Sequence, residues 1–121
     1  MRGPPVEVSG VEVRSEVSSS GDGMVASYEC VDETSDARVS GTAVTTVVLE
    51  HAPPTKMSRT FALSNDGGSW VGEWTGEITA DRNHIMEAVL VSAGGYEGLE
   101  YEVRWEGRSM LYTIAGTIRA D

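Results

Sequence analysis

Residues 65–83 read NDGGSWVGEWTGEITADRN. Its bulky and glycine residues fall at every second position: Trp70, Gly72, Trp74, Gly76 and Ile78. Glu73 and Glu77 stand between them, and turn-forming residues flank both ends. Because successive side chains of a β-strand point to opposite faces, this spacing predicts a strand with one dry face and one solvated face.

The rest of the chain repeats this pattern. Segments rich in Val, Thr and aromatic residues alternate with glycine-containing turns, and no window has the apolar spacing of a helix. The sequence therefore predicts an all-β chain with strands at residues 6–17, 24–31, 39–50, 56–64, 69–79, 84–92, 99–106 and 110–119.

Short connections join these segments without a long crossover. Consecutive hairpins of this kind favour a closed up-and-down barrel, which leaves no exposed strand edge. We therefore expect residues 1–121 to form a single eight-stranded antiparallel β-barrel domain. A barrel of about eight strands holds packed side chains or one small ligand, so its inner face is where function is expected.

Composition excludes several classes of partner. Asp and Glu total 19 against 9 Lys and Arg, a net charge of −10, which disfavours binding to nucleic acid or to an anionic membrane. The sequence contains neither a signal-peptide core nor a membrane-spanning apolar run, so we expect a cytoplasmic protein. Cys30 is the single cysteine and the two histidines lie far apart, so we expect no disulfide, metal or cofactor.

The last predicted hairpin indicates which residues face inward. With a turn at residues 107–108, Trp105 pairs with Met110 and Val103 pairs with Tyr112, so the two apolar rows coincide. This register places the aromatic residues of both strands on one face.

A second hairpin agrees with the first. With NDGG as its turn, Leu63 pairs with Trp70 and Arg59 pairs with Trp74. Glycines between the rings leave room for neighbouring rings or for a ligand. The expected lining is Met57, Phe61, Leu63, Trp70, Trp74, Ile78, Leu99, Tyr101, Val103, Trp105, Met110, Tyr112, Ile114 and Ile118.

The first strand does not keep one apolar face. Its valines lie at positions 6 and 8 and then at 11, 13 and 17. A β-bulge at Ser9 and Gly10 would bring them to the same face, so we expect a bulge there.

The C-terminal half of the sequence resembles a known family. GGYEGLEYEVRW at residues 94–105, after DGGSWVGEW and before a final strand ending AGTIR, looks like the closing hairpins of allene oxide cyclase-like barrels. This group includes dirigent proteins and small bacterial barrels that guide cyclisations of the Diels–Alder type. The resemblance implies an eight-stranded barrel that holds a hydrophobic linear substrate in a folded shape, commonly as a dimer or trimer.

Arg59 is a candidate catalytic residue. The register places its guanidinium on the inner face opposite Trp74, where it would bind a substrate carboxylate or carbonyl while stacked on the indole. Alternatively, Arg59 lies near the rim and reaches water, or its strand is shifted by one residue.

The direction in which the Glu87 side chain points depends on the turn before its strand. A three-residue loop, with Asn83 in the left-handed conformation, pairs His84 with Ala80 and turns Met86, Ala88 and Leu90 inward. A two-residue loop turns Glu87 inward as a candidate general acid or base with a raised pKa. We prefer the first register, which leaves Glu87 on the surface.

Tyr28, Tyr101 and Tyr112 offer hydroxyl groups that would donate to a carbonyl, or would instead be core residues bonded to backbone. Cys30 lies among acidic residues, which disfavours a thiolate nucleophile. No nucleophile, phosphate-loop or dinucleotide motif is present.

The predicted function is therefore that of a cofactor-independent cyclase or isomerase. A shaped cavity that brings the ends of a flexible substrate together needs few proton transfers. The catalytic candidates are Arg59, Tyr101, Tyr112 and Glu87, and the substrate-binding candidates are Phe61, Leu63, Trp70, Trp74, Trp105, Tyr28, Met57 and Met110. The expected partner is a small hydrophobic molecule, and a homodimer or homotrimer is an option. The alternatives are a lipocalin-like barrel that binds without catalysis and a solidly packed interaction protein.

Overall fold

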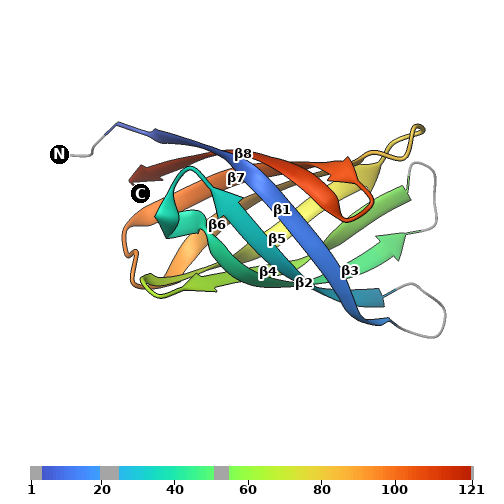
Figure 1. Cartoon of the computed structure of the whole chain (residues 1–121), viewed down its shortest axis with the longest axis horizontal. Coiled ribbons are helices and arrows are strands. Elements are labelled where there is room, and N and C mark those ends of the chain that lie inside the picture. The colour runs from blue at the N-terminus through green and yellow to red at the C-terminus, as the bar shows by residue number, and fades with distance from the viewer. Residues whose placement is uncertain (1–3, 20–24, 51–54, 121) are drawn as a thin grey trace.

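The computed structural model describes residues 4–19, 25–50 and 55–120, with side chains for residues 4–18, 25–48 and 60–120. Within these ranges the chain forms eight strands and one short 3-10 helix, η1 (Figure 1). Their bounds are β1 Val6–Ser19, β2 Val25–Thr34, η1 Ala37–Val39, β3 Gly41–Glu50, β4 Thr55–Asn65, β5 Gly68–Ile78, β6 His84–Gly94, β7 Leu99–Arg108 and β8 Leu111–Ala120.

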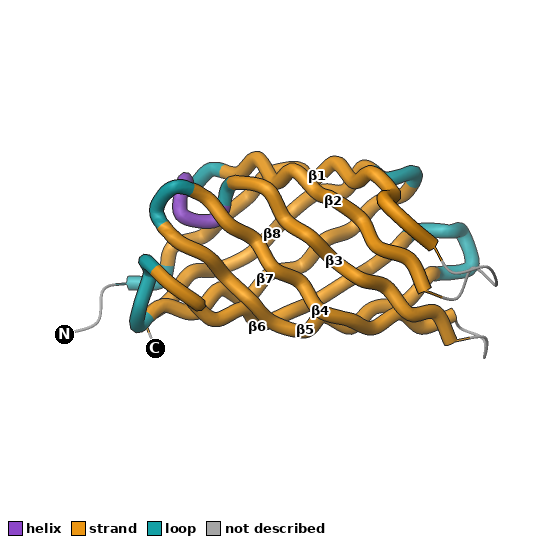
Figure 2. The backbone as a smooth tube through the Cα atoms, turned by 90° about the horizontal axis from the view of Figure 1, so that it is seen from below, coloured by secondary structure: helices purple, strands orange, loops and turns teal. Residues whose placement is uncertain are grey.

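The strands close into one barrel. Each strand pairs antiparallel with its neighbours in chain order, and β8 pairs with β1. The strands run obliquely around the barrel, as Figure 2 shows. The predicted all-β fold and the closed eight-stranded antiparallel barrel are thus confirmed.

One end of the barrel, which we call the capped end, carries both chain termini and η1 (Figure 1). Val39 of η1 is fully buried, and the Trp70 indole nitrogen donates to the Arg38 carbonyl at 2.7 Å. Tyr96 stacks on Trp70 with ring centroids 5.4 Å apart and donates its hydroxyl to Asn65 at 2.6 Å. Packing and hydrogen bonds together therefore close this end.

The opposite end is formed by the β5–β6 and β7–β8 connections, and we call it the β5–β6 end. Residues that face inward here, including Tyr28, Ile78 and His84, are only partly buried. Solvent therefore reaches inward-facing side chains at this end.

The core contains most of the predicted lining. Phe61, Leu63, Trp70, Trp74, Tyr101, Val103, Trp105, Tyr112, Ile114 and Ile118 are all buried. The Met57 side chain lies outside the described residues, although Met57 pairs with Gly76 as predicted.

The glycines of β5 make room for neighbouring side chains. A Cβ built on Gly72 would lie 2.8 Å from Leu90 Cδ2, and one built on Gly76 would lie 2.9 Å from Met86 Cγ. Leu90 and Met86 of β6 therefore fill the spaces beside these two glycines.

The hairpin of β4 and β5 has the predicted register. Leu63 pairs with Trp70, Arg59 pairs with Trp74, and residues 66–67 form the turn. Each pair joins residues of the same face, which explains why this register could be deduced from the sequence.

The hairpin of β7 and β8 has a different register from the predicted one. Trp105 pairs with Ile114 rather than Met110, because Ser109 and Met110 form the turn with φ of 58° and 67°. Met110 is 37% exposed, so its prediction as a cavity residue was wrong. The register differs from the predicted one by four residues. Because four is an even number, all the remaining residues of the hairpin keep their predicted faces.

The structure of the first strand contradicts the bulge predicted at Ser9 and Gly10. β1 pairs with β8 without interruption from Val6 to Val13, and the register shift of β1 against β2 lies instead between Glu16 and Ser18. The valines at positions 11, 13 and 17 are therefore exposed. The residues between them, Glu12 and Arg14, point into the barrel.

Candidate functional site

The interior of the barrel holds a charged cluster, defined here as Glu12, Arg14 and Asp32. These residues are 0%, 5% and 2% exposed. Glu12 and Arg14 are two residues apart on β1 and so share its inner face, and Asp32 on β2 pairs directly with Glu12. Strand alternation and one register thus bring three ionisable groups together in an aromatic core.

Glu12 and Arg14 form a buried ion pair. Arg14 Nε donates a hydrogen bond to Glu12 Oε1. The guanidinium carbon lies 4.8 Å from the Tyr112 ring centroid and 5.7 Å from that of Trp74. Aromatic faces attract a cation, so the two rings add to the stabilisation that the carboxylate provides.

Asp32 is the protonated member of the charged cluster. Burial, followed by the hydrogen bond with Glu12 and the charge of Glu12, raises the pKa of Asp32 to about 10. The Trp105 indole and the Arg14 charge oppose this rise without cancelling it. At neutral pH Asp32 is therefore a carboxylic acid that can donate a hydrogen bond, beside a carboxylate and a guanidinium whose charges balance.

Polar atoms without partners gather in this region. Among the described side chains, the buried nitrogen and oxygen atoms that lack a hydrogen-bond partner are Glu12 Oε2, Arg14 Nη2, Asp32 Oδ1, Tyr101 Oη and Trp105 Nε1. Buried polar groups are normally satisfied, because leaving one unpaired costs about 1–3 kcal/mol. Donors and acceptors are thus both available to a bound molecule.

The charged cluster is linked to the β5–β6 end. The Tyr112 hydroxyl lies 3.3 Å from His84 Nδ1, and His84 is partly exposed. Burial and the nearby Arg14 charge lower the pKa of His84, so its imidazole is neutral at physiological pH. Arg14 follows Glu12 along β1, which runs from the capped end toward the β5–β6 end, so Arg14 lies on the side of the charged cluster nearer this end (Figure 1).

A hydroxyl group orients one of the cavity tryptophans. Trp74 Nε1 donates to Thr45 Oγ1 at 2.7 Å, and that hydroxyl donates to the Thr60 carbonyl at 2.7 Å. Thr45 is 1% exposed. The chain of hydrogen bonds fixes the Trp74 ring beside Arg14.

The predicted tyrosines lie inside the barrel, as expected. Tyr101 and Tyr112 are buried, and Tyr28 is partly buried near the β5–β6 end. Burial raises the pKa of all three phenols, so they are hydrogen-bond donors rather than phenolates. The Arg59 side chain lies outside the described residues, and its catalytic role stays a prediction.

Glu87 is not an interior acid. It is exposed on β6, and its Oε1 lies 3.8 Å from Arg104 Nη1. Met86, Ala88 and Leu90 point inward instead. The preferred face was therefore correct and the catalytic candidate was wrong. The turn differs in detail, since His84 pairs with Ile78 and Arg82 has a φ of 68°.

Cys30 is buried opposite Arg14 on β2. Burial and the neighbouring Glu12 raise the pKa of this thiol, which opposes thiolate chemistry. Within the described part of the chain, no group of three His, Cys, Asp or Glu residues is placed to hold a metal ion.

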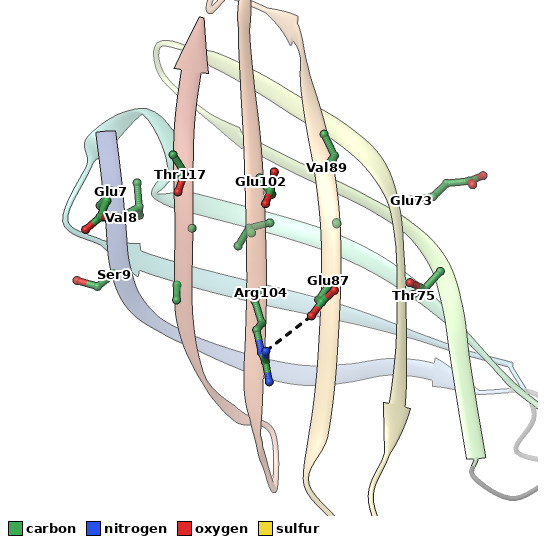
Figure 3. Close-up of a pocket in the computed structure, with 14 residues that line it drawn as sticks. Glu7, Val8, Ser9, Glu73, Thr75, Glu87, Val89, Glu102, Arg104 and Thr117 are labelled. Atoms are coloured by element: carbon green, nitrogen blue, oxygen red, sulfur yellow. Dashed lines mark ion pairs between the residues drawn. The ribbon is translucent and has the colours of Figure 1, made fainter. Parts of the chain in front are cut away.

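An open hollow of about 1330 Å³ lies on the outer face (Figure 3). Its labelled residues come from β1 and β5–β8 and include Glu7, Glu73, Glu87, Glu102 and Arg104. The charged cluster lies inside the wall and is separate from this acidic surface.

Sequence reasoning missed Glu12, Arg14, Asp32 and Thr45. On an unbroken β1, alternation places Glu12 and Arg14 on the same face as Val8, although β1 alone does not show that this face is the inner one.

Comparison with models of protein families, with curated proteins and with solved structures finds no match to this chain. In the described part of the chain, no helix has the length and apolar character needed to cross a membrane.

Proposed function

We propose that this barrel binds a hydrophobic small molecule and acts as a cyclase or isomerase without a cofactor. One observation carries the proposal: a charged cluster with unpartnered donors and acceptors stands in an aromatic barrel interior. A core that served stability alone would gain from apolar residues at these positions, because buried ion pairs are often replaced by hydrophobic side chains without loss.

Each group has a chemical role in this proposal. Arg14 donates a hydrogen bond to a substrate oxygen, the protonated Asp32 keeps its single hydrogen bond to Glu12, and the rings of Trp74 and Tyr112 hold the apolar part. Confinement of a flexible chain with its reacting atoms together contributes up to roughly 7–11 kcal/mol in favourable intramolecular cases. Hydrogen bonds from donors that are fixed before binding add to that effect.

A carrier of the same architecture is the second candidate function. Trp70, Trp74 and Trp105 are each 0% exposed and β6 side chains fill the spaces beside the β5 glycines, so either candidate requires these side chains to move apart when a ligand binds. A carrier needs only the binding part of the site.

Tryptophan fluorescence tests both candidates. Titration with apolar carbonyl compounds is expected to give saturable quenching that weakens in Trp74→Phe and persists in Glu73→Gln, whose carboxylate is exposed on the same strand. Product analysis then separates the two: altered product identity or stereochemistry supports the cyclase, and unchanged ligand supports the carrier. Emission that no compound alters would contradict both.

A further inference from the structure

We propose that the Glu12–Arg14 pair enolises an uncharged carbonyl compound. Glu12 takes a proton from the carbon beside the carbonyl, and Arg14 holds the carbonyl oxygen. This inference rests on the proposed function, since it requires a small molecule inside the barrel.

The unpartnered atoms of the pair supply a base and a donor side by side. Within the pair, Arg14 Nε donates to Glu12 Oε1. Another atom of each group, Glu12 Oε2 and Arg14 Nη2, has no hydrogen-bond partner. Both groups are nearly completely buried, with side-chain exposures of 0% and 3%. An acceptor and a donor held this close match the hydrogen and the oxygen at the two ends of an H–C–C=O unit.

The charge of the cluster selects an uncharged ligand. Glu12 and Arg14 carry opposite charges and Asp32 is neutral, so the cluster has no net charge to offer an anion. A carboxylate bound here would add an uncompensated negative charge to a dry interior, which is costly. A ketone or aldehyde adds none.

The proton transfer keeps that balance. The C–H bond beside the carbonyl breaks, its proton forms an O–H bond with Glu12 Oε2, and its electron pair forms the C=C bond of the enolate. The negative charge moves to the oxygen beside Arg14, so the interior stays neutral overall. Return of the proton to the same carbon gives exchange, and its return to a conjugated carbon shifts a double bond.

The position of Arg14 is suitable for such a ligand. Its guanidinium carbon lies 4.8 Å from the Tyr112 ring centroid and 5.7 Å from that of Trp74, and Arg14 follows Glu12 along β1 toward the β5–β6 end, where Tyr28 and His84 are partly exposed. The apolar part of the ketone would contact these rings. Asp32 then acts as a positioning residue, because its hydrogen bond holds the Glu12 carboxylate toward the ligand.

Hydrogen–deuterium exchange of 1-tetralone in D2O tests the inference directly. NMR is expected to show loss of the C2 proton signal faster than in buffer, with a rate that saturates with ketone concentration. Glu12→Gln is expected to lower the protein-dependent rate about 100-fold or more. Glu7→Gln, an exposed carboxylate on the same strand, is the matched control and keeps the full rate.

A measurement on the unmodified protein covers the case in which Glu12→Gln does not fold. A base on one side of a bound ketone deuterates one face of C2 in excess, whereas buffer deuterates both faces equally. Racemic exchange in the presence of the folded protein would overturn the inference.

Binding assays distinguish failure of the enolisation inference from failure of the proposed function. Saturable quenching by 1-tetralone without exchange above buffer would overturn enolisation alone. Tighter binding of 2-naphthoate than of 1-tetralone would overturn the preference for an uncharged ligand. Absence of quenching by 1-tetralone, 2-naphthoate and tetralin would contradict both proposals.

Discussion

Asp32 on β2 pairs directly with Glu12 on β1, and both side chains point into the barrel with exposures of 2% and 0%. Two carboxyl groups this close in a dry interior cannot both ionise at neutral pH, so one keeps its proton. Arg14 forms an ion pair with Glu12, and the proton stays on Asp32. The stability and the proposed chemistry of the protein both depend on this arrangement.

The proton on Asp32 predicts an inverted dependence of stability on pH. Its pKa is about 10 in the folded state against 3.8 as the ordinary value, so between these values the folded state binds more protons than the unfolded chain. The contribution is fully present below about pH 4 and is lost as the pH rises through 10. The free energy of unfolding attributable to Asp32 therefore falls with rising pH, by at most about 1.4 kcal/mol per pH unit.

Asp32→Asn isolates this effect, because the amide stays neutral at every pH. In urea unfolding at pH 5, 7 and 9, the free energy of unfolding of the variant is expected to rise relative to that of the wild type as the pH rises. Comparison with the wild type cancels the titration of the exposed carboxylates. A difference that is constant with pH would show that Asp32 is ionised in the folded state.

The buried ion pair predicts a large cost on truncation. Arg14→Met leaves the Glu12 carboxylate buried without its cation, and we expect a loss of roughly 3–5 kcal/mol in the free energy of unfolding. Arg119→Met breaks the exposed pair with Glu102, whose atoms lie 2.5 Å apart, and should cost at most about 1 kcal/mol.

A double variant checks the cause of this loss. Glu12→Leu combined with Arg14→Met removes both charges, so it is expected to be more stable than Arg14→Met alone. Urea unfolding of Glu12→Leu, Arg14→Met, the double variant and the wild type completes the cycle. Equal losses for Arg14→Met and Arg119→Met would mean that the Arg14 charge is solvated.

The hairpin of β4 and β5 could be predicted to the residue because its turn and its apolar alternation agree. In the hairpin of β7 and β8 the turn was misplaced, since Ser109 and Met110 are unusual residues for positive φ. The inner face was still correct because the error was an even number of residues.

The charged cluster could not be predicted in the same way. Valine is a strand former that usually signals a buried face, and Glu and Arg usually signal solvent, so the part of β1 after residue 10 is predicted from the sequence with its faces reversed. What keeps Glu12 and Arg14 inside is supplied by other strands: Asp32 from β2 and the Tyr112 and Trp74 rings from β8 and β5. No local pattern on β1 contains that information.

The close contacts at Gly76 predict that alanine is not tolerated there. A Cβ at Gly76 would lie 2.3 Å from the Ile85 carbonyl oxygen and 2.9 Å from Met86 Cγ, so the backbone of β6 would have to shift. We expect Gly76→Ala to lower the free energy of unfolding by about 1–3 kcal/mol.

Gly94→Ala is the matched control for this substitution. The nearest atom to a Cβ at Gly94 is Ser69 Oγ at 3.9 Å, an ordinary contact. The free energy of unfolding, measured by thermal unfolding followed by circular dichroism, should therefore change by less than about 0.5 kcal/mol for this variant. Equal destabilisation by the two variants would mean that the contact with β6 is not what excludes a side chain at Gly76.

The capped end predicts a local role for Asn65. Its amide nitrogen donates to the carbonyls of Arg38 and Ser40 at 3.0 and 2.9 Å, and its amide oxygen accepts from the Tyr96 hydroxyl at 2.6 Å. Asn65→Ala removes these bonds and leaves their partners to find others, so a loss of about 1–3 kcal/mol is expected.

Hydrogen exchange locates the consequence of Asn65→Ala. Amide protection should fall in residues 37–40 and at Gly67 and Gly68 while the strands at the β5–β6 end keep theirs, because the lost bonds join η1, Tyr96 and the β4–β5 turn at the capped end. Asn83→Ala serves as the control, since the Asn83 side-chain oxygen accepts one exposed bond from Arg108 Nε at 3.0 Å and should contribute little. Exchange that rises equally throughout the barrel in Asn65→Ala would show that η1 opens only when the whole barrel unfolds.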